Sequence, residues 1–151
     1  MLPMTLRDTI ALIEAVASAQ PDVNMIVRND IYKLNSCPAA RYGAFAWTQE
    51  QHREGIDDYG PSFTFVLFYV DRLTEDGGNQ VEVQSTAIST LRNVIRALAA
   101  TLEIEDWTYN TFNQRFADLC AGAFARVTIR VPADTICPED YDTENQEILT
   151  I

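Results

Sequence analysis

The strongest constraint on the fold is the run PSFTFVLFYVDRL, Pro61 to Leu73, which is apolar and aromatic throughout most of its length. In a β-strand, successive side chains point to opposite faces of the sheet. One face would then carry Phe63, Phe65, Leu67 and Tyr69, and the other would carry Val66, Phe68 and Val70. The apolar side chains on both faces must be shielded from water. The run therefore predicts a central strand packed on each side, or a strand whose second face is kept for a partner chain.

Two segments have the spacing of amphipathic helices. The first runs from Thr5 to about Ala19. Thr5 is expected to be its N-cap, and Asp8 three residues later makes a variant of the capping box with Asp in place of Glu. In the second, from about Val81 to Thr101, apolar residues step by three, four, three and four. These residues are Ile88, Leu91, Ile95, Leu98 and Leu102, and Arg92 and Arg96 lie on the polar side.

The other segments are typical of strands and turns. Strands are expected at 23–32, in the first part of 41–60, at 106–116 and at 124–131, and the segment 117–123 is expected to be a turn. In the last strand, Ala125, Val127, Ile129 and Val131 alternate with more polar residues. Residues 49–60 are polar and end in Gly60-Pro61, which predicts a long, exposed β-hairpin arm leading into the central strand.

The order of these elements predicts an α+β fold, an antiparallel β-sheet with two helices packed on one face. Residues 1–133 are expected to form a single domain. No third helix is expected to cover the second sheet face. That face, which carries Phe68, then needs either a curled sheet or a neighbouring subunit.

The charge of the chain is concentrated at its C-terminal end. The sequence has 22 Asp and Glu against 11 Lys and Arg, a formal net charge of −11. Residues 134–151 contain six acids and no base, namely Asp134, Glu139, Asp140, Asp142, Glu144 and Glu147. This segment is interpreted as an extended acidic C-terminal arm, either a tail or an arm that orders only on a partner. The absence of a basic cluster disfavours tight binding to nucleic acid.

Nothing in the sequence predicts catalysis. His52 is the only histidine and lies in QHREG, which is interpreted as an exposed hairpin tip rather than an acid–base site. Cys37, Cys120 and Cys137 are far apart and lack the spacing of zinc ligands. We therefore expect a non-enzymatic protein with no metal and no cofactor. The N-terminus lacks the basic region of a signal peptide, and no apolar run is long enough for a membrane helix.

Four segments resemble the small tail-terminator and head–tail joining (connector) proteins of tailed bacteriophages. They are TLRDTIALIEAVA, TFVLFYVDRL, VQSTAISTLRNVIRALA and FNQRFADLCAGAFARVTIRVPAD. The resemblance implies a non-catalytic virion protein, assembled in the host cytoplasm, that forms a ring of six or twelve subunits and contacts neighbouring virion proteins. DNA would pass through the lumen without tight binding, because an acidic lumen repels it.

Candidate interface residues come from the arm, the acidic segment and two aromatic positions. They are Glu50, Arg53, Glu54, Ile56, Tyr59, Phe68, Trp107, Ile136 and Tyr141. A second hypothesis is a soluble adaptor or binding module that recognises a protein partner through a sheet edge. A small hydrolase is the third. A ring is a large closed oligomer, whereas an adaptor is a monomer or a dimer, so size separates the first two hypotheses.

Overall fold

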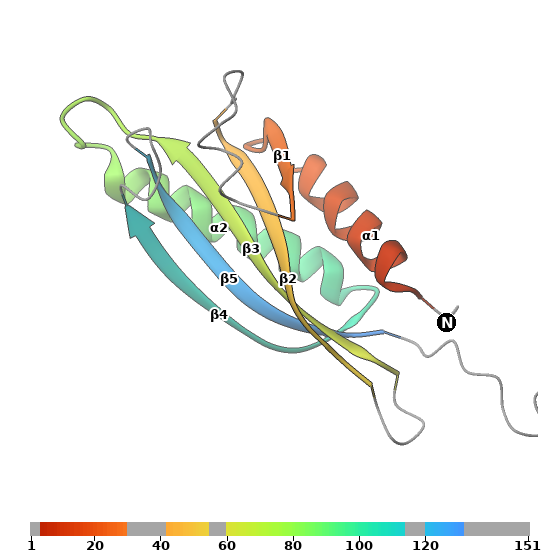
Figure 1. Ribbon diagram of the computed structural model, residues 1–151. Helices are drawn as coiled ribbons and strands as arrows, with labels where there is room; N and C mark the ends of the chain where they lie inside the picture. Colours follow the sequence, from red (N-terminus) through yellow and green to blue (C-terminus); the bar gives the residue numbers. More distant parts are fainter. Residues whose placement is uncertain (1–3, 30–41, 55–59, 114–119, 132–151) are drawn as a thin grey trace, which may run out of the picture.

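The computed structural model describes residues 4–29, 42–54, 60–113 and 120–131, which contain two helices and five strands (Figure 1). In chain order the elements are α1 (Leu6–Ser18), β1 (Met25–Arg28), β2 (Ala44–Arg53), β3 (Ser62–Arg72), α2 (Gln80–Ala99), β4 (Glu103–Asn113) and β5 (Cys120–Arg130). The strands form one sheet in the order β1-β2-β3-β5-β4. Both helices pack on the same face of this sheet and share one core with it. The α+β fold is therefore confirmed.

The sheet is mixed rather than purely antiparallel. β1 pairs with β2 in parallel, with Met25 opposite Ala44 and Arg28 opposite Trp47, whereas every other neighbouring pair is antiparallel. A parallel pair needs a connection of about a dozen residues or more. The 15 residues from 29 to 43 provide that length, so β2 can start at the same end of the sheet as β1.

The central strand β3 confirms the alternation predicted for the run from Pro61 to Leu73. On the helix side, its side chains join the main core: Phe63, Phe65, Leu67 and Tyr69. On the opposite side, which we call the open face, Val66, Phe68 and Val70 join a second cluster with small residues of β2. Phe68 is only 8% exposed. The apolar half of the open face is thus buried within a single chain.

Both helices follow their local signals. The hydroxyl of Thr5 accepts a hydrogen bond from the Asp8 backbone N–H, and the Asp8 carboxylate accepts one from the Thr5 N–H. These bonds lower the pKa of Asp8 below its usual range. In α2, Leu91, Ile95 and Leu98 are buried and Arg92 and Arg96 are exposed, as the helical spacing predicts.

Strand boundaries differ from the prediction at several places. β5 begins at Cys120, so the described part of the predicted turn at 117–123 is strand. Small residues form this stretch because β3 passes very close: a Cβ on Gly122 would lie 1.9 Å from the carbonyl oxygen of Tyr69. β4 begins at Glu103, three residues before the predicted start. β2 and β3 form the expected hairpin, paired as far as Arg53 and Ser62.

Within the described part of the chain, no helix has the length and apolar character needed to cross a membrane.

Candidate interface surfaces

The hairpin end of the open face carries an ion pair that joins β2 and β5. Glu50 sits at the bulge in β2, and its carboxylate accepts hydrogen bonds from Nε and Nη2 of Arg126 at 2.8 and 2.9 Å. This pairing raises the pKa of Arg126. Both side chains are exposed, so the pair stabilises the fold little and leaves a polar surface above β3.

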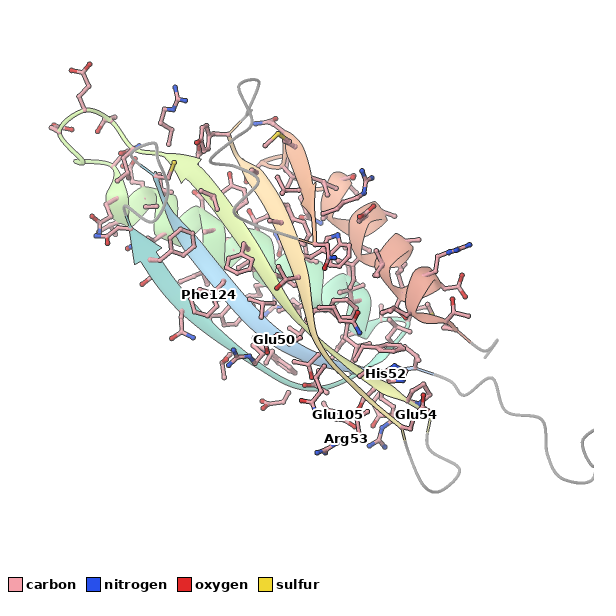
Figure 2. All side chains as sticks on the ribbon, in the orientation of Figure 1. Glu50, His52, Arg53, Glu54, Glu105 and Phe124 are labelled. Atoms are coloured by element: carbon pink, nitrogen blue, oxygen red, sulfur yellow. The ribbon has the colours of Figure 1, made fainter. Side chains whose placement is uncertain are left out.

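The predicted arm residues lie at this same end of the sheet (Figure 2). Nε2 of His52 lies 2.6 Å from Oε1 of Glu54, and the His52 ring meets the edge of Phe63 at a centroid distance of 4.8 Å. Arg53 is exposed and pairs in register with Ser62. His52 and Glu54 are both exposed to solvent. The arrangement is that of a surface contact.

The two predicted aromatic positions have opposite environments. Phe68 packs against Phe124 on the open face, with ring centroids 5.7 Å apart, so it is a packing residue rather than an exposed contact. Trp107 is opposite Val127 in the β4–β5 register, which places it on the helix side, and it is 47% exposed. Glu50, Arg53 and Glu54 are brought together, but Trp107 is on the other face. The remaining candidates, Ile56, Tyr59, Ile136 and Tyr141, lie outside the described residues.

A groove that the sequence did not reveal runs between α2 and β4. It has a volume of about 400 Å³ and is lined by Val81, Gln84, Ser85, Ile88, Ser89 and Arg92 of α2 and by Thr111 of β4. The side-chain amide of Gln84 donates a hydrogen bond to the backbone carbonyl of Phe112 at 3.3 Å, which fixes the helix against the strand. We call this surface the α2/β4 groove.

β4 is the outer strand of the sheet next to this groove (Figure 1). Its first half carries Glu103, Glu105 and Asp106 and an irregularity between Ile104 and Asp106. Charges and bulges of this kind protect an edge strand from pairing with other chains. The second half, WTYNTFN from Trp107 to Asn113, has no charge, no proline and no register shift. This half is suited to contact with another chain.

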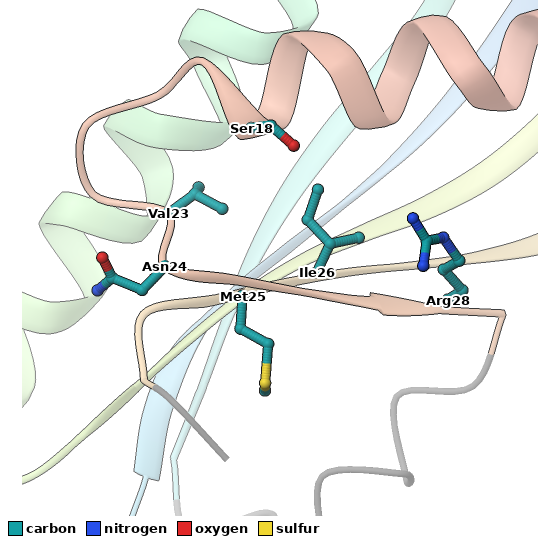
Figure 3. Close-up of a pocket in the computed structure, with 6 residues that line it drawn as sticks. All are labelled: Ser18, Val23, Asn24, Met25, Ile26 and Arg28. Carbon is teal, nitrogen blue, oxygen red and sulfur yellow. The ribbon is translucent and has the colours of Figure 1, made fainter. Parts of the chain in front are cut away.

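A second hollow lies at the other sheet edge, between the end of α1 and β1 (Figure 3). It also measures about 400 Å³ and is lined by Ser18, Val23, Asn24, Met25, Ile26 and Arg28. The Arg28 guanidinium is held by Glu14, and the Asn24 amide donates to the Tyr42 carbonyl. The principal polar groups here bind the elements of this chain to one another.

Metal-ligating side chains do not gather in the part of the chain that the structure describes: it contains no group of three or more His, Cys, Asp or Glu residues placed to hold an ion. Cys120 is buried, and Cys37 and Cys137 lie outside the described residues.

Comparison with known proteins adds no family. No protein-family model matches the chain, and no curated protein matches it.

Sequence reasoning missed the α2/β4 groove because its two walls are separated along the chain. The spacing of Arg92 and Arg96 placed them on the polar side of a helix but did not indicate which strand lies beside that side. The one available signal was the short link between α2 and β4, which favours neighbouring positions for consecutive elements.

Proposed function

We propose that this chain is a non-enzymatic structural subunit that forms a ring in a tailed-bacteriophage virion, of the tail-terminator or head–tail connector type. The observation that carries the proposal is the pair of unlike sheet edges, β1 on one side and β4 on the other. Two unlike surfaces on opposite sides of a subunit allow head-to-tail contacts, and such contacts generate closed rings when the rotation between subunits closes.

The second half of β4 supports this contact. An uncharged edge segment that contains exposed Trp107 is costly to leave unpaired in a soluble protein, because such edges pair with other chains. The net charge of −11 fits a ring through which DNA passes without sticking, since like charges repel. The partners are then further copies of this chain, in rings of six or twelve, and neighbouring virion proteins. The location is the virion, assembled in the host cytoplasm.

The same edge also favours the second hypothesis, an adaptor that takes up a partner strand at β4. Such a chain stays a monomer or dimer when purified, whereas the ring subunit forms a closed oligomer.

The test is the size and shape of the purified full chain. Light scattering and negative-stain electron microscopy should show a ring of uniform subunit number. Asn110→Lys adds a charge to the exposed second half of β4 and should reduce assembly, whereas Asn93→Lys makes the same change on an exposed position of α2 and should not. A chain that stays monomeric at high concentration excludes the ring. Equal assembly of both variants excludes the β4 edge as the contact.

A further inference from the structure

We propose that the α2/β4 groove binds the acidic segment 134–151 of a second copy of this chain. The proposal rests on the proposed function in one respect, that copies of this chain assemble with one another. It names the segment and the surface that make the contact.

The groove side of α2 carries positive charge that the described structure does not neutralise. α2 has one acid, Glu82 in its first turn, and no other until Glu103 after the helix ends. Neither Arg92 nor Arg96 has a hydrogen-bond or ion-pair partner among residues 4–29, 42–54, 60–113 and 120–131. By contrast, three other arginines in the described ranges are held by acids: Arg28 by Glu14, Arg126 by Glu50 and Arg130 by Glu105.

The groove is also bordered by exposed apolar surface. Among the described residues, the large hydrophobic side chains that are exposed are Val81, at 76%, and Trp107, at 47%. Val81 lines the groove, and Trp107 lies on the same face of β4 as Thr111, which also lines it. Two such side chains on one surface, beside unpaired arginines, are typical of a binding site for another chain.

Trp107 lies level with the two arginines along the groove. Gln84 is fixed to Phe112, and α2 and β4 run in opposite directions from their short link. Arg92 and Arg96 are roughly 12 and 18 Å along the helix from Gln84, at 1.5 Å per residue. Trp107 is roughly 17 Å along β4 from Phe112. Arg92 lines the groove, and Arg96 and Trp107 lie further along α2 and β4, so an extended ligand that continues past Arg92 can contact an aromatic ring and guanidinium groups.

The acidic segment has the complementary chemistry. Its six acids and lack of any base match the positive side of α2. Its apolar residues can contact Val81 and Trp107; Ile136 and Tyr141 lie between the acids, and Ile148 and Leu149 follow the last one. Nucleic acid fits less well, because residues 1–133 contain 16 acids against 11 bases and no basic cluster.

The direction of β5 favours a second copy over the same chain as the source of this segment. Val131 follows β5 at the hairpin end, where its N–H donates to the Pro61 carbonyl. The part of the groove lined by Val81 and Thr111 is near the opposite end of β4, roughly 30 Å away at about 3.3 Å per strand residue. The last described residue therefore lies at the opposite end of the sheet from that part of the groove in the same chain. The 20 residues from 132 to 151 have a maximum reach of roughly 70 Å, which is enough to contact a neighbour.

The first experiment measures binding of a fluorescein-labelled peptide with the sequence 134–151 to the full chain, by fluorescence anisotropy. Saturable binding that weakens with added salt is expected. Arg92→Glu with Arg96→Glu should weaken it by roughly tenfold or more, since reversed charges now repel the acids. Trp107→Ser should weaken it by a smaller factor. Arg7→Glu reverses a single charge at an exposed position of α1 and should leave the binding unchanged, whereas Arg92→Glu alone should already weaken it.

Circular dichroism and thermal melting of each variant show that it is folded before it is titrated. Absence of saturable binding, or equal weakening by Arg7→Glu and by the groove substitutions, overturns the proposal.

A mixing experiment identifies the copy that supplies the segment. One full-length variant carries the groove substitutions, and another carries Glu139→Gln, Asp140→Asn, Asp142→Asn and Glu144→Gln in the segment. Each alone should self-associate weakly, and the 1:1 mixture should form heterodimers, because one intact groove then meets one intact segment. The mixture could stay dissociated although the groove substitutions weaken binding of the peptide. That result shows that the segment binds the groove of its own chain, and it overturns the assignment to a second copy.

The failures of the two proposals are distinguishable. If the groove variant and the segment variant each form rings as well as the wild type, the groove assignment is overturned and the proposed ring function stands. A wild-type chain that never forms rings excludes the proposed function, and the peptide titration then decides on the groove by itself.

Discussion

Glu14 connects three elements of the fold, and its removal should destabilise the protein through one of its two contacts. From α1, its carboxylate accepts a hydrogen bond from Nε1 of Trp47 on β2 at 2.9 Å and from Nε of Arg28 on β1 at 2.8 Å. The two donors differ in burial, because Trp47 is 6% exposed whereas the Arg28 side chain is 67% exposed. The perturbation is Glu14→Ala.

The magnitude follows from this difference. Without Glu14, the buried indole N–H of Trp47 loses its acceptor, and leaving a buried donor unpaired costs about 1–3 kcal/mol. The contact with Arg28 counts for less, because that side chain is 67% exposed and exposed ion pairs contribute little. We expect a loss of about 2 kcal/mol in the free energy of unfolding. For a chain of this size that lowers the melting temperature by roughly 4–8 °C.

Urea denaturation followed by circular dichroism measures the change, and a double-mutant cycle with Trp47→Phe isolates the pair. Arg28→Met is the control and should destabilise the protein by only a small part of that amount. The reasoning is refuted if Arg28→Met destabilises as much as Glu14→Ala, or if the coupling between Glu14 and Trp47 is close to zero.

Four further outcomes are expected. Burial raises the pKa of Glu14, but its hydrogen bonds outweigh burial and leave that pKa lowered. The contribution of Glu14 to stability should therefore be present at neutral pH and lost as the pH falls below about 4. A Glu14→Gln variant with the same dependence of stability on pH as the wild type would contradict this. Gly122→Ala places a Cβ against the Tyr69 carbonyl and should lower the free energy of unfolding by about 1–3 kcal/mol or more in urea melts; a neutral result would argue against the close approach. Phe65→Asp should prevent folding, because it puts an unpaired charge in the core, and a soluble variant that melts cooperatively would disprove it. Deletion of residues 135–151 should leave the melting temperature nearly unchanged while weakening assembly in light scattering; a large drop in melting temperature would make the segment part of the fold.

The features predicted correctly depend on residues close together in the chain. The alternation in β3, the capping box at Thr5 and the buried spacing of α2 are all set within a few residues. Local spacing determines which side of an element is apolar, so these predictions needed no knowledge of the neighbours.

The features that were missed depend on contacts between distant segments. The Ala-Gly-Ala sequence at 121–123 has the composition of a turn, and only the close approach of the neighbouring strand β3 to Gly122 explains why small residues occupy a strand there. The parallel pairing of β1 depends on where a 15-residue connection leads, which its composition does not indicate. The α2/β4 groove was missed for the same reason, since Arg92 and Thr111 belong to different elements.

The burial of Phe68 changes where an assembly contact should be sought. The sequence left two ways to cover the second face of β3, packing within the chain or a neighbouring subunit. Within one chain, Phe68 already packs against Phe124, and Arg126 and Glu50 bridge the polar half of that face. The large apolar side chains that remain exposed in the described ranges, Val81 and Trp107, are instead beside the α2/β4 groove. A partner that buries apolar surface on this protein gains most at that groove and the adjoining edge of β4, and substitutions there should affect assembly more than substitutions on the open face.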